Sequence, residues 1–369
     1  MRVPFNYLPY QFRNPNKIIS DWRELIRSTE FTIGPFVEKF EYEFAKFIGA
    51  KYCVSTNSGT DALILSLKSL GLKKGDEVIT VANTFYATVG AIVACNAKPV
   101  FVDCNQNYQI DETKIESVIT SKTKIIIPVH WGGASPNIKK IKHIAKKNNL
   151  IVLEDACMGI GAKVANKSPG TFGKIGVYSM HPLKSLNVMG DGGMIVTNDK
   201  KIFQWLHKYR NHGMLDRDHI EFWGVNSRLQ PLQAIVASNE LKNIPKIIKQ
   251  RNINANYLDS AFLNKRCKKY VKIPIRNKKN IESYSLYMAL FEDRDVLIKY
   301  LNKNKIEAKI HYKIPLHLQQ AAKKLKYSKG SFPEAEKQAA KLITLPVHQF
   351  LKKNQLDYMI EKIFSFYNI

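Results

Sequence analysis

The sequence predicts an α/β protein in which a large domain with a mostly parallel sheet precedes a smaller α+β domain. Three observations support this fold class. The 369 residues are 45% hydrophobic, which is enough to build two cores. Apolar runs of strand length alternate with amphipathic runs of helix length through the first two thirds of the chain. Lysine-rich helical segments follow from about Leu241, so we place the domains at residues 1–240 and 241–369.

The strands expected in the large domain are short apolar runs separated by helical segments. The clearest helices are DALILSLKSL (61–70) and IKKIKHIAKKNN (138–149). Strands that alternate with helices argue for a parallel sheet covered on both faces. The expected strands are EVITV (77–81), KPVFVD (98–103), KIIIPVH (124–130), LIVLED (150–155), VYSM (177–180) and GMIVTN (193–198).

The second domain begins with a lysine-rich helix and shows two further strand patterns. We expect strands at SYSLYMALF (283–291) and IEAKIHY (306–312), with a helix between them. No repeat or flexible linker separates the two domains, so we expect them to pack closely.

The net charge of +26 raises the question of a nucleic-acid partner, because phosphate-binding surfaces are basic. Here the charge is spread along the chain, and lysine outnumbers arginine roughly fourfold. Aromatic residues are not interleaved with the lysine pairs. We attribute the charge to a lysine-rich composition, expect no nucleic-acid partner, and keep a nucleic-acid binder as a competing class.

Cysteine usage and hydropathy indicate the compartment. No apolar run approaches the ~20 residues that cross a bilayer, and the amino terminus lacks a secretory pattern. The five cysteines are odd in number, scattered and never in a CxxC pair. We therefore expect a soluble, cytoplasmic protein with reduced thiols and no membrane partner.

Lys184 is the most informative residue of the chain. It lies in YSMHPLKSLNVMGDGGMIVTND (178–199), between an apolar strand and a glycine-rich turn that leads into another strand. A lysine at the edge of a packed core can lose its proton and act as a nucleophile or form a Schiff base. Its position indicates an enzyme.

Three further sites could serve such a lysine. Ser58, Gly59 and Thr60 lie where a loop turns into a helix, and backbone N–H groups there bind phosphate, although an ordinary helix N-cap is the alternative. Asp155 ends an apolar strand, where open α/β sheets bind ligands, although it could instead cap the next helix. Phe85 follows another strand and could either stack on a flat ligand or join the core.

Together these groups are what pyridoxal 5′-phosphate requires. The aldehyde needs a lysine, the phosphate needs helix-start amides and hydroxyls, the pyridine nitrogen needs a carboxylate, and the ring needs a flat neighbour. We therefore expect this cofactor. His130 and His181 have no second histidine or cysteine at metal-ligand spacing, so we expect no metal.

Several segments agree in order, spacing and content with one known family. They are FTIGPFVEKFEYEFAKFIGAKYCVSTNSGTDAL, VITVANTFYATVGAIVACNAKPVFVD, IIIPVHWGG, LEDAC, the Lys184 segment, RNHG, GVNSRLQPLQA and HYKIPLHLQ. The chain resembles the DegT/DnrJ/EryC1/StrS sugar aminotransferases. This resemblance implies the pyridoxal phosphate transferase fold of type I, with a seven-stranded type of sheet in the large domain.

The resemblance also implies roles for individual residues. Lys184 would form the Schiff base with pyridoxal phosphate, and Asp155 would pair with the protonated pyridine nitrogen. The other implied cofactor contacts are Ser58, Gly59, Thr60 and Ser179 at the phosphate and Phe85 at the ring.

Two more positions extend the resemblance. Asn226, in GVNSRL, resembles the residue that reaches a neighbouring subunit's phosphate, which implies a homodimer with shared active sites. Met158 stands where the family usually has a glutamine near the cofactor's phenolic oxygen. A thioether is only a weak acceptor, so that hydrogen bond must be lost or replaced.

The implied reaction is amino transfer, because this chain keeps Lys184 where some relatives that dehydrate their sugar have histidine. L-Glutamate would donate its amino group, pyridoxamine phosphate would form in between, and a nucleotide-linked keto-sugar would accept it. The KIHYKIPLHLQQ segment resembles enzymes that aminate C3 of dTDP-3-keto-6-deoxyhexoses, so we expect C3 rather than C4 of a UDP- or dTDP-4-keto-sugar.

Such deoxyamino sugars belong to glycan or lipopolysaccharide biosynthesis. A non-catalytic regulatory protein with the same fold is the alternative from a different functional class.

For Tyr312 and His317, packing between the domains is an open alternative to substrate binding. The residues expected at the substrate are Thr32, His181, His212, His311, Tyr312 and His317.

Overall fold

The computed structural model describes residues 1–369 and contains one large sheet of seven strands, in the order β1-β8-β7-β5-β4-β2-β3. Only β8 runs antiparallel to its neighbours. The predicted α/β class with a large, mostly parallel sheet is therefore confirmed. The strands are β1 (Tyr52–Thr56), β2 (Glu77–Val81), β3 (Lys98–Val102), β4 (Thr123–Ile126), β5 (Ile151–Asp155), β7 (Ile175–Ser179) and β8 (Gly193–Thr197).

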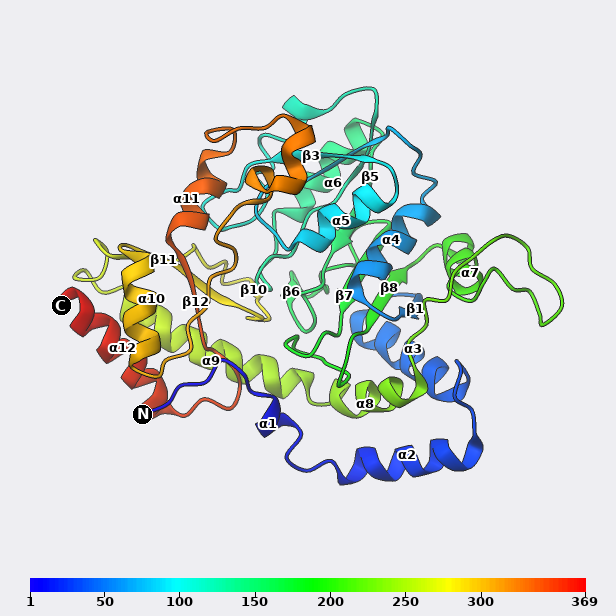
Figure 1. Cartoon of the computed structure of the whole chain (residues 1–369), viewed down its shortest axis with the longest axis horizontal. Helices are drawn as coiled ribbons and strands as arrows, with labels where there is room; N and C mark the ends of the chain where they lie inside the picture. Colours follow the sequence, from blue (N-terminus) through cyan, green and yellow to red (C-terminus); the bar gives the residue numbers. More distant parts are fainter.

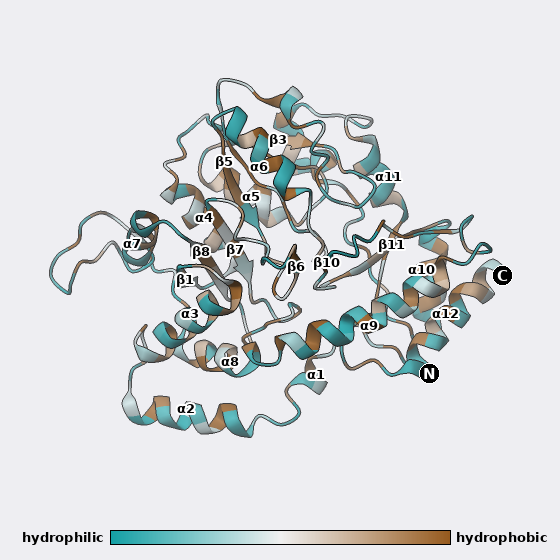
Figure 2. Cartoon of the chain, turned by 180° about the vertical axis from the view of Figure 1, so that it is seen from behind, coloured by the Kyte–Doolittle hydropathy of each residue, from teal (hydrophilic) through white to brown (hydrophobic).

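Helices cover both faces of this sheet (Figure 1). Successive strand residues point to opposite faces, so Ile195 of β8 packs with α4, α5 and α7, whereas Met194 and Val196 pack with α3 and α8. Figure 2 shows β5 and β8 as apolar between more polar helices. The helices of this part are α1 (Leu8–Gln11), α2 (Asn16–Ser28), α3 (Pro35–Ile48), α4 (Gly59–Ser69), α5 (Tyr86–Ala94), α6 (Ile138–Lys147), α7 (Lys200–Tyr209) and α8 (Pro231–Leu241).

The C-terminal part packs three helices on a three-stranded antiparallel sheet of order β12-β11-β9. The strand predicted at residues 283–291 is present as β11 (Tyr287–Phe291). Figure 1 shows α9 running from beside α8 to this sheet. The remaining α-helices and strands are α9 (Ile244–Phe262), α10 (Arg294–Lys303), α11 (Pro333–Lys341), α12 (Lys353–Tyr367), β9 (Val271–Lys272), β12 (Leu342–Leu345), and the pair β6 (Lys163–Val164) and β10 (Asn280–Ile281).

The prediction of a strand at residues 306–312 is wrong. Ile306 forms an isolated bridge with Val3, and Lys309 forms one with Thr344 of β12. The two bridges join different partners three residues apart, so no continuous ladder forms. The segment still runs beside β12 because Lys309 and Thr344 exchange two backbone hydrogen bonds of 3.0 and 2.8 Å.

The amino terminus packs against the C-terminal part. Val3 is fully buried in the cluster of β11, β12, α10 and α12, and the Gln355 side chain donates to the Arg2 carbonyl at 2.9 Å. We expected the first residues to belong with the large domain, and we now propose that residues 1–5 belong with residues 241–369. No helix of the structure is both long and apolar enough to cross a membrane.

Candidate active site

Lys184 lies in the loop that follows β7, where its backbone N–H donates to the His181 carbonyl at 2.8 Å. Burial lowers the pKa of Lys184, and the nearby Asp155 carboxylate opposes this shift. A lowered pKa increases the fraction of the amine that is neutral, which is the nucleophilic form. The structure therefore gives this lysine the reactivity that its sequence context indicates.

Asp155 ends β5, and its carboxylate is buried. The Thr88 hydroxyl donates to Oδ2 at 2.7 Å, and the Cys157 backbone N–H donates to Oδ1 at 3.1 Å. These two donors fix the plane of the carboxylate while each oxygen keeps a free lone pair. Asp155 can therefore accept a further hydrogen bond from a protonated ring nitrogen.

The start of α4 lies against the end of β7. A Cβ atom at Gly59 would be only 2.8 Å from Cβ of Ser179 and 3.2 Å from Sγ of Cys157, so only glycine fits there. Ser58 caps the helix by accepting from the Asp61 N–H at 3.0 Å, as the N-cap alternative expects. The N–H groups that begin the helix still have no intrahelical partner, and Thr60 is exposed beside them. The cap and the anion site are therefore compatible.

Phe85 occupies the N-cap position of α5, the helix that carries Thr88. Its ring centroid lies 4.0 Å from that of Tyr86 and 6.0 Å from that of Tyr312. The Thr88 bond to Asp155 and the close approach of Gly59 to Ser179 bring the starts of α4 and α5 to the carboxyl ends of β5 and β7, and the Lys184 loop follows β7. The structure brings together the residues that the sequence analysis singled out far apart.

The model of the DegT/DnrJ/EryC1/StrS aminotransferase family matches residues 14–364. The chain belongs to this family.

Two relatives and one solved structure cover nearly the whole aminotransferase. The "Pleiotropic regulatory protein" of Geobacillus stearothermophilus is 36% identical over 369 residues, which are 100% of this chain and 99% of the relative. The dTDP-3-amino-3,6-dideoxy-alpha-D-galactopyranose transaminase of Aneurinibacillus thermoaerophilus is 34% identical over 363 residues, 98% of each chain. The crystal structure of S. venezuelae DesV in complex with a ketimine intermediate has a TM-score of 0.95 at 30% identity and covers 99% of this chain and 98% of that one.

This aminotransferase therefore has the pyridoxal phosphate transferase fold, and it is a sugar aminotransferase that uses pyridoxal phosphate. Its residues fit that cofactor. Gly59 leaves the α4 amides open to a phosphate, Asp155 presents free lone pairs, and the pKa of Lys184 is lowered. The sequence predicted both the family and the cofactor.

Met158 holds the C-terminal part with its backbone rather than its side chain. Its carbonyl accepts from the hydroxyls of Ser283 at 2.5 Å and Ser285 at 2.9 Å. The thioether packs against the apolar cluster that contains Trp131 and Leu286. Met158 thus joins the loop after β5 to the segment that precedes β11, a contact that the sequence did not reveal.

The histidines and tyrosine expected at the substrate separate into two groups. His311 packs on Phe5, and burial together with the Lys184 charge lowers its pKa to about 4. Tyr312 lies between Phe85 and Trp131, with ring centroids 6.0 and 5.7 Å away. His317 instead pairs with Glu336 at 3.0 Å and packs on Phe332, which fits the packing alternative.

The other residues expected at the substrate are His181, Thr32 and His212. His181 is exposed, and burial of part of its ring and the Lys184 charge lower its pKa. Thr32 is exposed between α2 and α3. His212 has a φ of 63° and lies beside Asn211, which forms a bridge with Asn226.

Buried ionic groups near the site were missed by the sequence analysis. Glu154 accepts from His130 at 2.9 Å and from the backbone of Gly170 at 2.9 Å. Two more backbone N–H groups, of Phe172 and Gly173, donate to it at 2.6 Å. Glu154 therefore fixes the loop after β6, and His130 is a structural group; their spacing in sequence carries no signal of this pairing.

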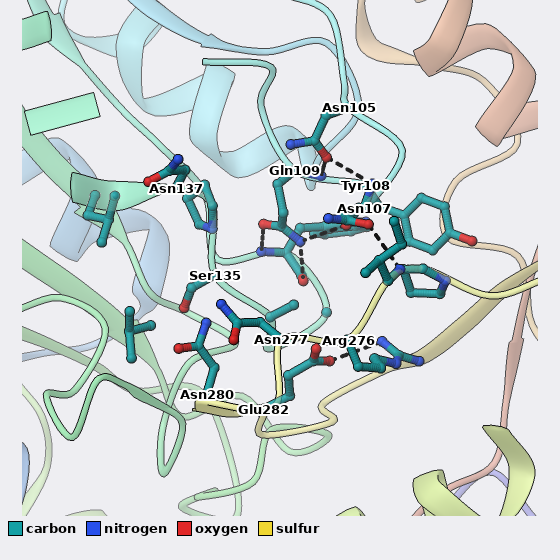
Figure 3. Close-up of a pocket in the computed structure, with 18 of the residues that line it drawn as sticks. Asn105, Asn107, Tyr108, Gln109, Ser135, Asn137, Arg276, Asn277, Asn280 and Glu282 are labelled. Carbon is teal, nitrogen blue, oxygen red and sulfur yellow. Dashed lines mark hydrogen bonds and ion pairs between the residues drawn. The ribbon is translucent and has the colours of Figure 1, made fainter. Parts of the chain in front are cut away.

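A separate cavity of about 430 Å³ lies between the large domain and residues 274–288 (Figure 3). Amide side chains converge on it from the loop after β3 and from the C-terminal part, among them Gln109, Asn277 and Asn280. Gln109 donates to the Trp131 carbonyl at 3.1 Å and accepts from its N–H at 3.2 Å. Lys184 and Asp155 do not line this cavity.

Proposed function

We propose that this aminotransferase transfers the amino group of L-glutamate to C3 of a dTDP-linked 3-keto-6-deoxyhexose. The observation that carries the proposal is the lysine of lowered pKa beside a buried carboxylate and an open helix start, in a chain 34% identical to a dTDP-3-amino-3,6-dideoxyhexose transaminase. The C4 position of a UDP- or dTDP-4-keto-sugar is the alternative acceptor.

Each residue of the site has a distinct task in this proposal. When bound, pyridoxal phosphate supplies the carbonyl that takes the amino group and the ring that withdraws electrons. The Lys184 Nζ atom would take the proton from the α-carbon of the donor and deliver it to C4′ of the cofactor, and it would move a proton in the reverse direction when the amino group passes to the sugar. Asp155 keeps the ring nitrogen protonated, because its charge is oriented by Thr88 and Cys157.

The remaining cofactor contacts bind and orient. Ser58, Gly59, Thr60 and Ser179 hold the phosphate at the start of α4, where the helix dipole favours an anion. Phe85 covers one face of the ring. The Met158 thioether offers the cofactor's phenolic oxygen only a weak hydrogen-bond acceptor.

For the sugar we propose contacts with Thr32, His181, His212, His311 and Tyr312. His311 is neutral at pH 7 because its pKa lies at about 4, so it can orient a sugar hydroxyl without attracting the anionic nucleotide. We do not propose His317 as a contact, since Glu336 already engages it.

We also propose a cytoplasmic homodimer in which Asn226 reaches the partner's phosphate site. The loop between α7 and α8, which projects from the body of the molecule in Figure 1, supports this proposal. Its apolar side chains Leu215, Ile220 and Trp223 are 60%, 47% and 85% exposed, an arrangement typical of an association surface.

The deciding experiment is incubation with dTDP-3-keto- and dTDP-4-keto-6-deoxysugars and L-glutamate, followed by NMR of the aminated carbon. Amination at C3 supports the proposal, and amination at C4 alone overturns it. A regulatory role is the second candidate, which the name of the Geobacillus stearothermophilus relative favours. Failure of glutamate to convert the bound cofactor in a single turnover would support that role instead.

A further inference from the structure

The N-terminal segment contacts the backbone of Lys184 itself. The Tyr7 hydroxyl donates to the Lys184 carbonyl at 2.7 Å, across 177 residues of sequence. Tyr7 is 4% exposed, so water does not compete freely for this bond. A side chain from outside the large sheet therefore fixes the peptide that bears the reactive amine.

Two neighbouring residues of the loop are held in the same way. Ser185 accepts from Nη1 of Arg251 at 3.1 Å, and the Asn187 amide donates to Gln11 at 3.1 Å. Ser185 and Asn187 are both buried. The loop is thus fixed at three of four consecutive positions by groups from the N-terminal segment and from α9.

The N-terminal segment is in turn anchored to the C-terminal part, which contains the three-stranded sheet. Val3 exchanges backbone hydrogen bonds of 2.9 and 3.0 Å with the backbone of Lys305 and Glu307. The Phe5 N–H donates to the Glu307 carboxylate at 2.9 Å, and Nε2 of His348 donates to the Pro4 carbonyl at 3.0 Å. Residues 3–11 therefore form a strap, anchored at one end, whose other end reaches the lysine loop.

Arg251 connects this strap to the loop. Its guanidinium lies 5.1 Å from the centre of the Tyr7 ring, and its hydrogen bonds go to the neutral oxygens of Ser185, Tyr284 and Gln349. No carboxylate pairs with it, although its side chain is buried. The face of the Tyr7 ring therefore supplies a share of the charge stabilisation that a buried cation requires.

We propose that Tyr7 is a positioning residue for Lys184, and that the strap of residues 3–11 sets the place of the lysine amine. This inference rests on the proposed role of Lys184 in proton transfer. A small displacement of a reacting group slows a reaction strongly, because near-attack geometry is lost. Loss of the Tyr7 hydrogen bond slows proton transfer without removing any group that touches substrate or cofactor.

The test is Tyr7→Phe, which removes the hydroxyl and keeps the ring between Arg251 and His348. Hydrogen exchange at residues 184–187 of the apoenzyme should accelerate about tenfold, the effect of one lost hydrogen bond. In the enzyme loaded with cofactor, kcat should fall roughly five- to tenfold while KM for glutamate changes less than twofold. Tyr10→Phe is the matched control, because Tyr10 is 45% exposed and its hydroxyl makes no hydrogen bond within the chain.

Gln11→Leu is a second variant, which removes the contact with Asn187 and should accelerate exchange at Asn187. Wild-type exchange at residues 184–187 in Tyr7→Phe overturns the inference, as does an unchanged kcat. A lower thermal midpoint with unchanged local exchange would show a purely structural tyrosine and would also overturn it. Failure of the proposed lysine role is distinguishable, because it would show as full turnover in Lys184→Ala.

Discussion

Replacement of Gly59 by alanine tests the phosphate site by geometry alone. The new methyl group would begin 2.8 Å from Cβ of Ser179, so the start of α4 and the end of β7 must separate by roughly 0.6 Å to reach the 3.4 Å of an ordinary contact. Gly59 and Ser179, the two residues that would be forced apart, are both proposed to bind the phosphate. Overpacking of this kind costs about 1–3 kcal/mol, which we expect to weaken cofactor binding roughly 5- to 150-fold.

The assay is titration of the apoenzyme with pyridoxal phosphate, followed by absorbance, with a thermal melt to confirm folding. Gly90→Ala is the matched control, because Gly90 lies in α5, where an added methyl group would meet no atom within 4 Å and where alanine adopts the backbone readily. A dissociation constant for Gly59→Ala within twofold of wild type would refute the placement of the phosphate at this contact.

Three further changes probe the charges around the site. Asp155→Asn keeps the size of the side chain but removes its charge, so turnover should fall at least about 100-fold while the cofactor still binds, as kcat and bound absorbance will show. Glu154→Gln leaves His130 without an anionic partner and should lower the free energy of unfolding by about 3 kcal/mol in urea; a loss below about 1 kcal/mol would contradict the buried pair. Burial holds the pKa of His348 at about 4 against 6.5 unfolded, so the unfolded state binds the extra proton and stability falls as pH drops from 6.5 to 4. Thermal melts should show a smaller loss over this range in His348→Gln, and equal losses would exclude His348 as the cause.

Much of the fold followed from hydrophobic patterning, because strands buried on both faces are continuously apolar. β2 and β8 are examples, and each lies within the segment predicted for it, whereas β7 begins two residues before its predicted segment. β1 was not among the predicted strands, since Ser55 and Thr56 end it with polar side chains. Those side chains are buried: Ser55 donates to Glu41 at 2.7 Å and accepts from Arg210 at 2.9 Å, a pairing between distant segments that no local pattern encodes.

Some residues of the site could likewise be predicted from the sequence, and others could not. Lys184, Asp155 and Gly59 were identifiable because each follows or precedes a strand or helix of clear pattern. The bond from Tyr7 to Lys184 was not, because the partner of Tyr7 is a backbone carbonyl that carries no side-chain signature. Met158 marked a departure from the family, but only the structure shows that its carbonyl binds two serines of the other domain.

The central claim is that Lys184 moves the protons of amino transfer, and a single-turnover measurement tests it most directly. The purified enzyme loaded with pyridoxal phosphate is mixed with L-glutamate, and the visible absorbance of the bound cofactor is followed as it gives way to the near-ultraviolet absorbance of pyridoxamine phosphate. Lys163→Ala is the control, because burial also lowers the pKa of Lys163, whose amine donates to Ser168 at 2.9 Å away from the site. We predict full conversion in wild type and Lys163→Ala and a rate at least about 1,000-fold lower in Lys184→Ala; conversion of Lys184→Ala at the wild-type rate would contradict the account.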